Sequence, residues 1–244
     1  MRLDKALSHA GHGSRREVGR FIREGLVTVG GEAVRRPEAD VDPAKGIALC
    51  GQDIDYAEHY YIMMNKPAGV VSATEDPRER TALDLLDARH RRLGLFPAGR
   101  LDKDATGLLL LTTDGAYAHR LLSPARHVEK EYIVSVLGVF TPEVKAAFAA
   151  GITLGNNETC LPAGLEILSP STARIILREG KYHQIKRMTA ALGLKTVGIH
   201  RVRMGALTLD ETLSPGGWRR LRGGETDIYY HETFGFGNSV QTGR

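Results

Sequence analysis

The sequence has few of the features that mark disulfide-bonded, zinc-binding or membrane proteins. Its 244 residues include only two cysteines, Cys50 and Cys160, which lie far apart and belong to no CxxC motif or Cys/His cluster, so neither a disulfide framework nor a zinc site is indicated. We expect both to be small buried side chains. No apolar run approaches the ~20 residues that span a bilayer, and the first residues, MRLDKALSHAG, lack the uninterrupted apolar core of a signal peptide. We therefore expect a soluble cytoplasmic protein with no membrane partner.

Basic residues are concentrated in two regions, although the net charge of the chain is only +4. Residues 1–36 contain eight basic and four acidic residues, and residues 172–203 contain eight basic residues against one acid, Glu179. The rest of the chain is acidic on balance. Two basic regions in a neutralised background are typical of a protein that holds a polyanion such as nucleic acid at defined places. Solvated surface charge is the alternative, and the positions of the charges must decide between the two.

The first part of the chain predicts a small helix-turn-hairpin module, which we assign with its linker to residues 1–58. Ser14 and Glu17 form a capping-box pattern, and the helix that they begin should end at Gly25. Two short strands, Leu26–Val29 and Glu32–Val34, flank the Gly30-Gly31 pair and predict a tight hairpin. The prolines, glycines and scattered acids of Arg36–His59 indicate the edge of the module and a linker.

Basic residues on the predicted helix are candidates for RNA binding. Three arginines at i, i+4 and i+7 share one face, whereas Val18, Phe21 and Ile22 share another. We call Arg16, Arg20 and Arg23 the arginine stripe. One face can therefore pack while the stripe binds phosphate, and Lys5 and Arg15 complete the set of candidate RNA-binding residues.

From Tyr60 onward the pattern changes to short strands with few helices, and we assign residues 59–222 to a second domain. The expected strands are Tyr60–Met64, Val70–Ser72, Leu108–Thr112, Tyr132–Val136, Gly164–Leu168, Arg174–Leu177, Thr196–Val202 and Trp218–Leu221. One helix should run from Thr141-Pro142 to Gly151 and another from His183 to Leu192, stopped by Gly193. Because strands and helices do not alternate regularly, the predicted fold class is α+β with a mixed, largely antiparallel sheet. Residues 223–244 lack periodicity, and we expect a mobile tail.

The string GRLDKDATG, residues 99–107, is the strongest candidate for an active-site loop. It leads directly into the apolar run Leu108–Leu111, so its polar side chains should lie at the edge of a buried sheet, where a site can be held rigidly. Asp102 is the candidate catalytic carboxylate. Two other interpretations remain open: Asp102 and Asp104 could only cap a turn, or they could bind Mg²⁺ as in nucleases.

Two further strings carry candidate site residues. Tyr132 follows Glu129-Lys130-Glu131 at the start of an alternating strand, where it could be half-buried packing or could stack on a base. The string EGKYHQIKRM, residues 179–188, is a turn that enters a helix inside the second basic region. Lys186 or Arg187 near Asp102 would favour its ionised form. His183 could be an acid or base, but because no partner for it is visible in the sequence, we interpret it as an RNA contact or as the residue that begins the helix. Asn65–Gly69, NKPAG, reads as a structural turn that ends a strand.

Taken together, these strings resemble the RsuA-type pseudouridine synthases, which act on ribosomal RNA. The resemblance rests on NKPAG, GRLDKDATGLLLLTTDG, EKEY and EGKYHQIKRM, in this order, and spans about residues 1–222. The segment MRLDKALSHAGHGSRREVGRFIREGLVTVGG is similar to the small RNA-binding module that these enzymes share with a ribosomal small-subunit protein. The resemblance implies a pseudouridine synthase fold for the second domain.

The resemblance also implies roles for individual residues. Asp102 matches the catalytic aspartate, Tyr132 the tyrosine that packs on the target base, and Lys186 the basic residue that pairs with the aspartate, with Arg187 as the alternative. Arg100 matches an arginine that fills the space left by the flipped nucleotide, and His183, Gln184 and Arg187 are candidate substrate contacts. No metal and no organic cofactor are implied.

The expected activity is the isomerisation of uridine to pseudouridine in 16S small-subunit ribosomal RNA, by a monomer acting on the RNA or on a ribosomal assembly particle. A large-subunit (23S) target and a non-enzymatic assembly factor that only binds RNA are the alternatives.

Overall fold

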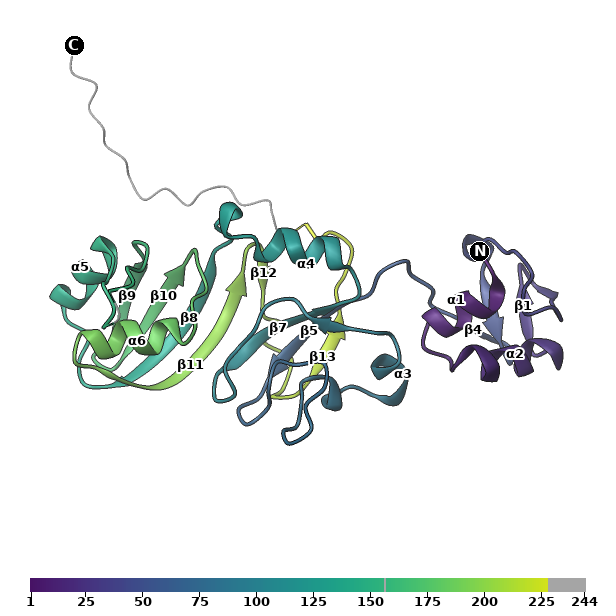
Figure 1. Ribbon diagram of the computed structural model, residues 1–244, viewed down its shortest axis with the longest axis horizontal. Coiled ribbons are helices and arrows are strands. Elements are labelled where there is room, and N and C mark those ends of the chain that lie inside the picture. The colour runs from purple at the N-terminus through teal and green to yellow at the C-terminus, as the bar shows by residue number, and fades with distance from the viewer. Residues whose placement is uncertain (156, 228–244) are drawn as a thin grey trace, which may run out of the picture.

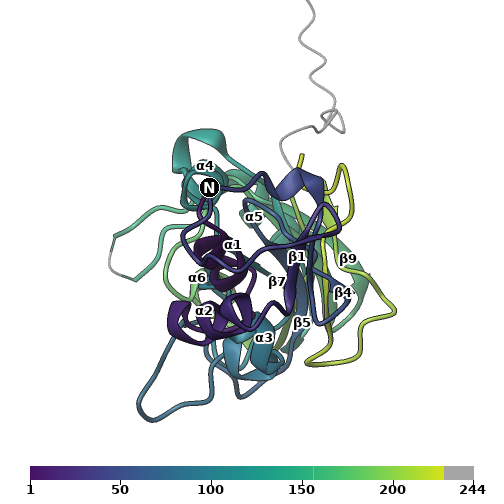
Figure 2. The same cartoon turned by 90° about the vertical axis from the view of Figure 1, so that its right-hand side faces the viewer.

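The computed structural model describes residues 1–155 and 157–227, which form a small N-terminal module and a larger sheet domain (Figure 1). The module contains a four-stranded antiparallel sheet in the order β2-β1-β3-β4. Seen from the end of the molecule in Figure 2, α1 and α2 lie on one side of β1 and β4. The elements of the module are α1 (Leu3–His9), α2 (Arg15–Arg23), β1 (Val27–Val29), β2 (Glu32–Ala33), β3 (Ile47–Leu49) and β4 (Gln52–Asp53).

Local signals explain the helix and the hairpin of the module, and both predictions are confirmed. The Ser14 side chain accepts a hydrogen bond from the Glu17 backbone N–H, while the Glu17 carboxylate accepts one from the Ser14 N–H, so the capping box is complete. Gly30 and Gly31 have φ angles of 59° and 86°, which is the left-handed pair that a two-residue type I′ hairpin requires.

Two expectations for the module are wrong. Arg36–His59 is not simply an edge and a linker, because it supplies β3 and β4, which form half of the module's sheet. Cys50 is exposed, whereas Cys160 is buried as expected. The physical reason is that Cys50, with φ 52°, and Gly51, with φ 77°, form the tight turn between β3 and β4, and a turn at the end of a hairpin projects into solvent.

The larger domain is built on a nine-stranded sheet whose main path runs β13-β5-β7-β11-β8-β10-β9. Among the described residues, the only parallel pair in this sheet is β7 with β11, so the predicted mixed, largely antiparallel sheet is confirmed. Two short strands lie off the path, β6 beside β7 and β12 beside β11. The strands are β5 (Tyr61–Lys66), β6 (Phe96–Pro97), β7 (Thr106–Thr112), β8 (Lys130–Leu137), β9 (Gly164–Ser169), β10 (Thr172–Leu177), β11 (Lys195–Met204), β12 (Leu207–Thr208) and β13 (Trp218–Arg220).

The two predicted helices of this domain are confirmed, as α5 (Pro142–Ala150) and α6 (Gln184–Ala191). Thr141 caps α5 through its hydroxyl, and the left-handed Gly151 follows that helix. Two further helices, α3 (Ala88–Arg91) and α4 (Gly115–Leu122), were not predicted from the sequence. One prediction is wrong: Val70–Ser72 forms no strand but only a single bridge from Val71 to Thr81. This segment is instead held beside the loop of residues 99–107 by the Ser72 hydroxyl, which forms hydrogen bonds with the backbone of Leu101.

The apolar run of β7 is explained by burial on both faces of the sheet. Leu109 and Leu111 belong to the main core, whereas Leu108 and Leu110 pack into a second core with Tyr117 of α4. Figure 1 shows α4 beside this central part of the sheet and α5 and α6 beside the half formed by β8, β9 and β10. A strand that separates two cores has no polar face, which is why its four leucines are consecutive.

In the part of the chain that the structure describes, no helix is both long and apolar enough to cross a membrane. The expected tail divides into two parts. Residues 223–227 are described and include Glu225, which forms an ion pair with Arg219 of β13 at 2.8 Å. The remainder, residues 228–244, lies outside the described residues.

Candidate active site

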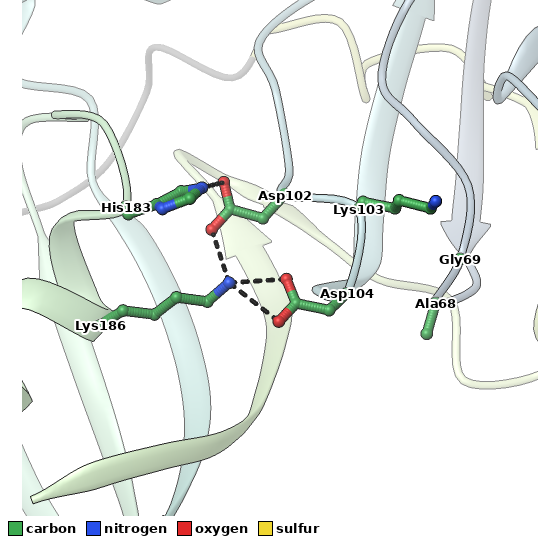
Figure 3. Close-up of a pocket in the computed structure, with 7 residues that line it drawn as sticks. All are labelled: Ala68, Gly69, Asp102, Lys103, Asp104, His183 and Lys186. Carbon is green, nitrogen blue, oxygen red and sulfur yellow. Dashed lines mark hydrogen bonds and ion pairs between the residues drawn. The ribbon is translucent and has the colours of Figure 1, made fainter. Parts of the chain in front are cut away.

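A pocket of about 430 Å³ lies where the loop after β6 meets the start of α6 (Figure 3). Its walls come from three segments that are far apart in the sequence, and its lining residues are Ala68, Gly69, Asp102, Lys103, Asp104, His183 and Lys186. The pocket lies near the one place where β7 and β11 run side by side, at Thr106–His200 and Gly107–Arg201. The candidate residues of the two most distinctive strings therefore meet in one site.

Lys186 lies between the two carboxylates of the loop. Its Nζ is 3.3 Å from Asp102 Oδ2, and it donates to both oxygens of Asp104 at 2.7 and 2.9 Å. The hydrogen bond from Lys186 lowers the pKa of Asp104. Burial acts to lower the pKa of Lys186, but the hydrogen bonds and charges of Asp104 and Asp102 outweigh it and raise that pKa. Lys186 is thus held in its charged form beside Asp102 at neutral pH.

The structure brings His183 to Asp102 as well, and it directs Arg187 elsewhere. His183 Nε2 lies 3.7 Å from Asp102 Oδ1, on the side away from Lys186 (Figure 3). Arg187 instead forms an ion pair with Glu158 at 2.8 Å. Of the two alternatives left open by the sequence, Lys186 is the residue that contacts Asp102. The Asp102 side chain is 28% exposed, which leaves it accessible from the pocket.

The backbone of the Asp102 loop is held by buried polar side chains. Ser72 both donates to the Leu101 carbonyl and accepts from the Leu101 N–H, at 2.9 and 3.0 Å. Arg201, only 2% exposed, donates to the Leu108 carbonyl at 2.7 Å and to the Arg100 carbonyl at 3.3 Å. These bonds fix the two residues before the catalytic candidate and tie them to the start of β7, so its carboxylate is presented on a rigid loop.

Lys66, the last residue of β5, is fully buried beneath the same loop. Its Nζ donates to the carbonyls of Ala105 at 2.8 Å, Pro67 at 2.9 Å and Lys103 at 3.3 Å. Burial lowers the pKa of Lys66 to about 8, against the opposing charges of Asp104 and Asp102. The NKPAG string, interpreted from sequence as a turn that ends a strand, therefore also supplies the cation that ties this loop to the sheet.

Gly107 allows the two strands to meet beside the site. Its φ angle is +98°, and a Cβ at this position would lie 2.3 Å from the carbonyl oxygen of Arg201. No side chain fits at that distance, so a glycine is required where β7 pairs with β11.

The remaining site candidates lie around the pocket without lining it. Tyr132 is 9% exposed and belongs to the core that contains Leu101 and Ile185, which precede Asp102 and Lys186 in the chain. In the pairing of β8 with β11, Tyr132 lies opposite Arg201. The side chain of Arg100 is exposed. Gln184 is buried, and its side chain bonds the Lys181 N–H and the Glu179 carboxylate, so it orders the turn before α6.

The basic residues of the module are placed on its surface. All three members of the arginine stripe are exposed on α2, and so are Lys5 on α1 and Arg15. Arg20 approaches Glu24 only at 3.9 Å, with both side chains more than half exposed. Such an exposed pair contributes little to stability, so the stripe remains available for a ligand.

Three residues that help to build the site were not predicted from the sequence, namely Lys66, Ser72 and Arg201. Each acts through backbone carbonyls or amides of a loop distant in sequence, which leaves no motif to detect. A signal exists for one of them, because Lys66 is a charged residue at the end of the mostly buried strand β5, and such residues are rarely buried without partners. The strand of Arg201, β11, is mostly half-buried, so its pattern gives no such signal.

Comparisons with known proteins identify two families along the chain. The sequence model of the family described as RNA pseudouridylate synthase matches residues 60–191, and that of the S4 domain matches residues 1–45. The first match contains Asp102 and Lys186, and the second contains the arginine stripe.

Full-length relatives are similar over nearly the whole chain. The chain is 42% identical over 225 residues to ribosomal small subunit pseudouridine synthase A of Escherichia coli (strain K12), covering 91% of this chain and 96% of the relative. It is 42% identical over 226 residues to an uncharacterized RNA pseudouridine synthase, YtzG, of Bacillus subtilis (strain 168), with 91% and 95% covered. A crystal structure of a pseudouridylate synthase superposes with a TM-score of 0.68 at 37% identity, covering 94% of this chain and 100% of that one. The chain is therefore a member of the RNA pseudouridylate synthase family, with an N-terminal S4 domain.

Proposed function

We propose that this protein converts a uridine of 16S small-subunit ribosomal RNA into pseudouridine, with Asp102 as the catalytic carboxylate. The observation that carries the proposal is the Asp102 carboxylate on the pocket wall, 28% exposed and 3.3 Å from the Lys186 ammonium. The small-subunit target is supported by the similarity to relatives named ribosomal small subunit pseudouridine synthase A. A large-subunit target is the alternative.

The reaction requires a charged carboxylate beside the ribose of the target uridine. Pseudouridine forms when the N1–C1′ bond of uridine breaks, the uracil turns in place and a C5–C1′ bond forms, with the C5 proton lost and a proton gained at N1. A carboxylate near C1′ can attack that carbon or remove a proton to begin an elimination. In either route the Lys186 ammonium, 3.3 Å from Asp102 Oδ2, places a positive charge beside the reacting carboxylate.

The substrate contacts in this proposal come from residues around the pocket. Tyr132 stacks on the uracil and retains it after the glycosidic bond breaks, and Arg100 fills the space that the flipped nucleotide leaves. His183 contacts the substrate beside Asp102. Gln184 and Arg187 hold the turn that carries His183. The position of Tyr132 opposite Arg201, which itself bonds the Arg100 carbonyl, supports its assignment to the same site.

We assign RNA binding to residues 1–58 and catalysis to residues 59–222. The arginine stripe, with Lys5 and Arg15, grips the phosphate backbone at a distance from the pocket, which supplies binding energy toward flipping a base out of its stack. The proposed partner is ribosomal RNA or a ribosomal assembly particle, bound by a monomer in the cytoplasm.

The test is to incubate the purified protein with 16S and 23S ribosomal RNA in excess EDTA and to map pseudouridine by carbodiimide labelling and primer extension. The proposal requires pseudouridine at a defined position of intact 16S RNA. RNA cleavage that EDTA stops would instead indicate a metal-dependent nuclease using Asp102 and Asp104. Binding without modification would indicate an assembly factor, and modification of 23S RNA alone would overturn the target. Mapping total ribosomal RNA from a deletion strain checks the same site in cells.

A further inference from the structure

Tyr182 is an exposed aromatic residue next to the pocket, and neither the fold nor the proposed chemistry uses it. It is 77% exposed, more than any other large hydrophobic side chain in the described part of the chain. Its ring lies nearly parallel to that of His183, with centroids 3.8 Å apart and an angle of 19° between the planes. We call this pair the aromatic stack. Because one face of the Tyr182 ring is covered by His183, the exposure lies on the rest of the ring.

The aromatic stack extends outward from the catalytic carboxylate. His183 lines the pocket, and its Nε2 lies 3.7 Å from Asp102 Oδ1 (Figure 3). Tyr182 lies on this imidazole and does not line the pocket itself. The Tyr182 ring is therefore separated from the reacting carboxylate by a single side chain, which places it where the neighbours of a bound nucleotide would pass.

The backbone beneath the stack is held firmly. Lys181 donates from its N–H to the Gln184 side chain at 3.0 Å and from Nζ to the Thr159 carbonyl at 2.7 Å. The Tyr182 carbonyl accepts a hydrogen bond from Arg187. His183 has a φ angle of 47°, a left-handed conformation that is uncommon for residues with a side chain. The exposed ring is thus carried on a fixed turn rather than on a free loop.

We propose that Tyr182 is a stacking platform for an unpaired RNA base that flanks the target uridine. This inference rests on the proposed function, because it takes the target to be bound at Asp102. When a uridine is flipped out, its neighbours lose a stacking partner, and proteins bind such single-stranded bases by stacking them on aromatic rings. Tyr182 also lies within the basic segment of residues 172–203, whose charge favours a phosphate backbone.

A structural role for Tyr182 makes different predictions. If the ring only holds His183 against Asp102, its removal should lower kcat, because the carboxylate loses its neighbour, and should leave RNA affinity unchanged. If the ring instead stacks on a flanking base, its removal should weaken RNA binding and leave kcat unchanged. Such stacking contributes to the binding of the substrate and of the transition state equally, so its loss appears in KM and Kd.

The experiment compares Tyr182→Ala and Tyr182→Phe with a control at another exposed hydrophobic residue, Leu137→Ala. Leu137 is 60% exposed at the end of β8 and does not line the pocket. Steady-state kinetics on a ribosomal RNA fragment gives kcat and KM. We expect Tyr182→Ala to raise KM at least fivefold with kcat within about twofold, and Tyr182→Phe and the control to match the wild type.

The second readout locates the stacked base. RNA fragments carry 2-aminopurine in turn at each nucleotide beside the target and are bound to the Asp102→Asn protein, so that no turnover occurs. One position should show quenched fluorescence, and the added Tyr182→Ala change should restore it. Unchanged KM and quenching in the alanine variant, or a loss confined to kcat, would overturn the platform. A wild-type protein that forms no pseudouridine would instead overturn the proposed function, and the fluorescence would still test the stack.

Discussion

Replacing Lys66 by methionine should change the free energy of unfolding with pH in a direction that the structure dictates. Lys66 is fully buried, and burial lowers its pKa from an ordinary value of 10.5 to about 8. A difference of this size between the folded and unfolded chain corresponds to about 3 kcal/mol. The charged lysine carries this cost because it supplies hydrogen bonds to three carbonyls beneath Asp102, those of Pro67, Lys103 and Ala105.

The sign follows from the order of the two pKa values. Since the folded-state pKa of Lys66 lies below the unfolded one, the cost of its charge is fully present below pH 8 and is relieved as the pH rises toward 10.5. Methionine removes that cost but leaves buried carbonyls without donors, at ~1–3 kcal/mol each if they stay unpaired. The three carbonyls together would cost ~3–9 kcal/mol, so at pH 7 Lys66→Met should be no more stable than the wild type. Between pH 7 and pH 10 the wild type should gain about 2–3 kcal/mol relative to Lys66→Met.

The assay is urea unfolding of both proteins at pH 7, 8, 9 and 10, with the difference between them taken at each pH so that other titrating groups cancel. Lys145→Met, at an exposed position of α5, is the matched control. A difference between the wild type and Lys66→Met that stays flat or shrinks toward pH 10 would refute the reasoning, because it would mean that the buried ammonium bears no cost in the folded state.

The other predictions concern the site and the module. Lys186→Met should lower kcat at least tenfold, because the ammonium shared by the two carboxylates is lost, whereas Arg187→Met should stay within a few-fold; the opposite result would transfer the pairing role to Arg187. Tyr132→Phe should retain most activity, and Tyr132→Ala, checked for folding by its Tm, should lose stacking worth ~1–3 kcal/mol; an alanine variant with normal turnover would leave the ring as core packing. Changing the arginine stripe to alanine should make the slope of log Kd against log salt shallower by roughly two units, at ~0.7–0.9 per lost contact, with turnover at saturating RNA preserved. An unaltered slope would mean that the stripe binds no phosphate.

The parts of the fold that could be predicted from sequence are those set by short-range chemistry. The capping box of Ser14 and Glu17, the Gly30-Gly31 turn and the Thr141-Pro142 helix start each act within a few residues, and each is found where the sequence places it. The lack of a regular alternation of strands and helices likewise predicted a mixed, mainly antiparallel sheet, and the structure has one.

The wrong predictions concern segments whose structure is determined by contacts with distant parts of the chain. Val70–Ser72 has the composition of a strand, but Ser72 bonds Leu101 instead of joining a sheet. The side chain of Cys50 is suited to a core, but Cys50 lies in the turn between β3 and β4, where its side chain is exposed. The four strands of the module were only half recognised, because β3 and β4 are short and lie among prolines and glycines.

The candidate site divides in the same way. Asp102 and Lys186 could be selected because their strings are distinctive, and the structure brings them to 3.3 Å. The sequence could not decide between Lys186 and Arg187, because both lie on α6 and only the fold determines which one turns toward Asp102 and which toward Glu158. Lys66 and Arg201 escaped notice because their partners are backbone carbonyls, which carry no sequence signature.

The most direct test of the account compares Asp102→Asn with Asp104→Asn. Both changes remove a charge and keep the size of the side chain, and both carboxylates contact Lys186, but Asp104 is 71% exposed whereas Asp102 is 28% exposed on the pocket wall. Pseudouridine formation in ribosomal RNA should be abolished in Asp102→Asn, with RNA affinity within a few-fold of the wild type, and should be only mildly reduced in Asp104→Asn. Substantial activity in Asp102→Asn, or an equal loss in the two variants, would contradict the assignment of Asp102 as the catalytic carboxylate.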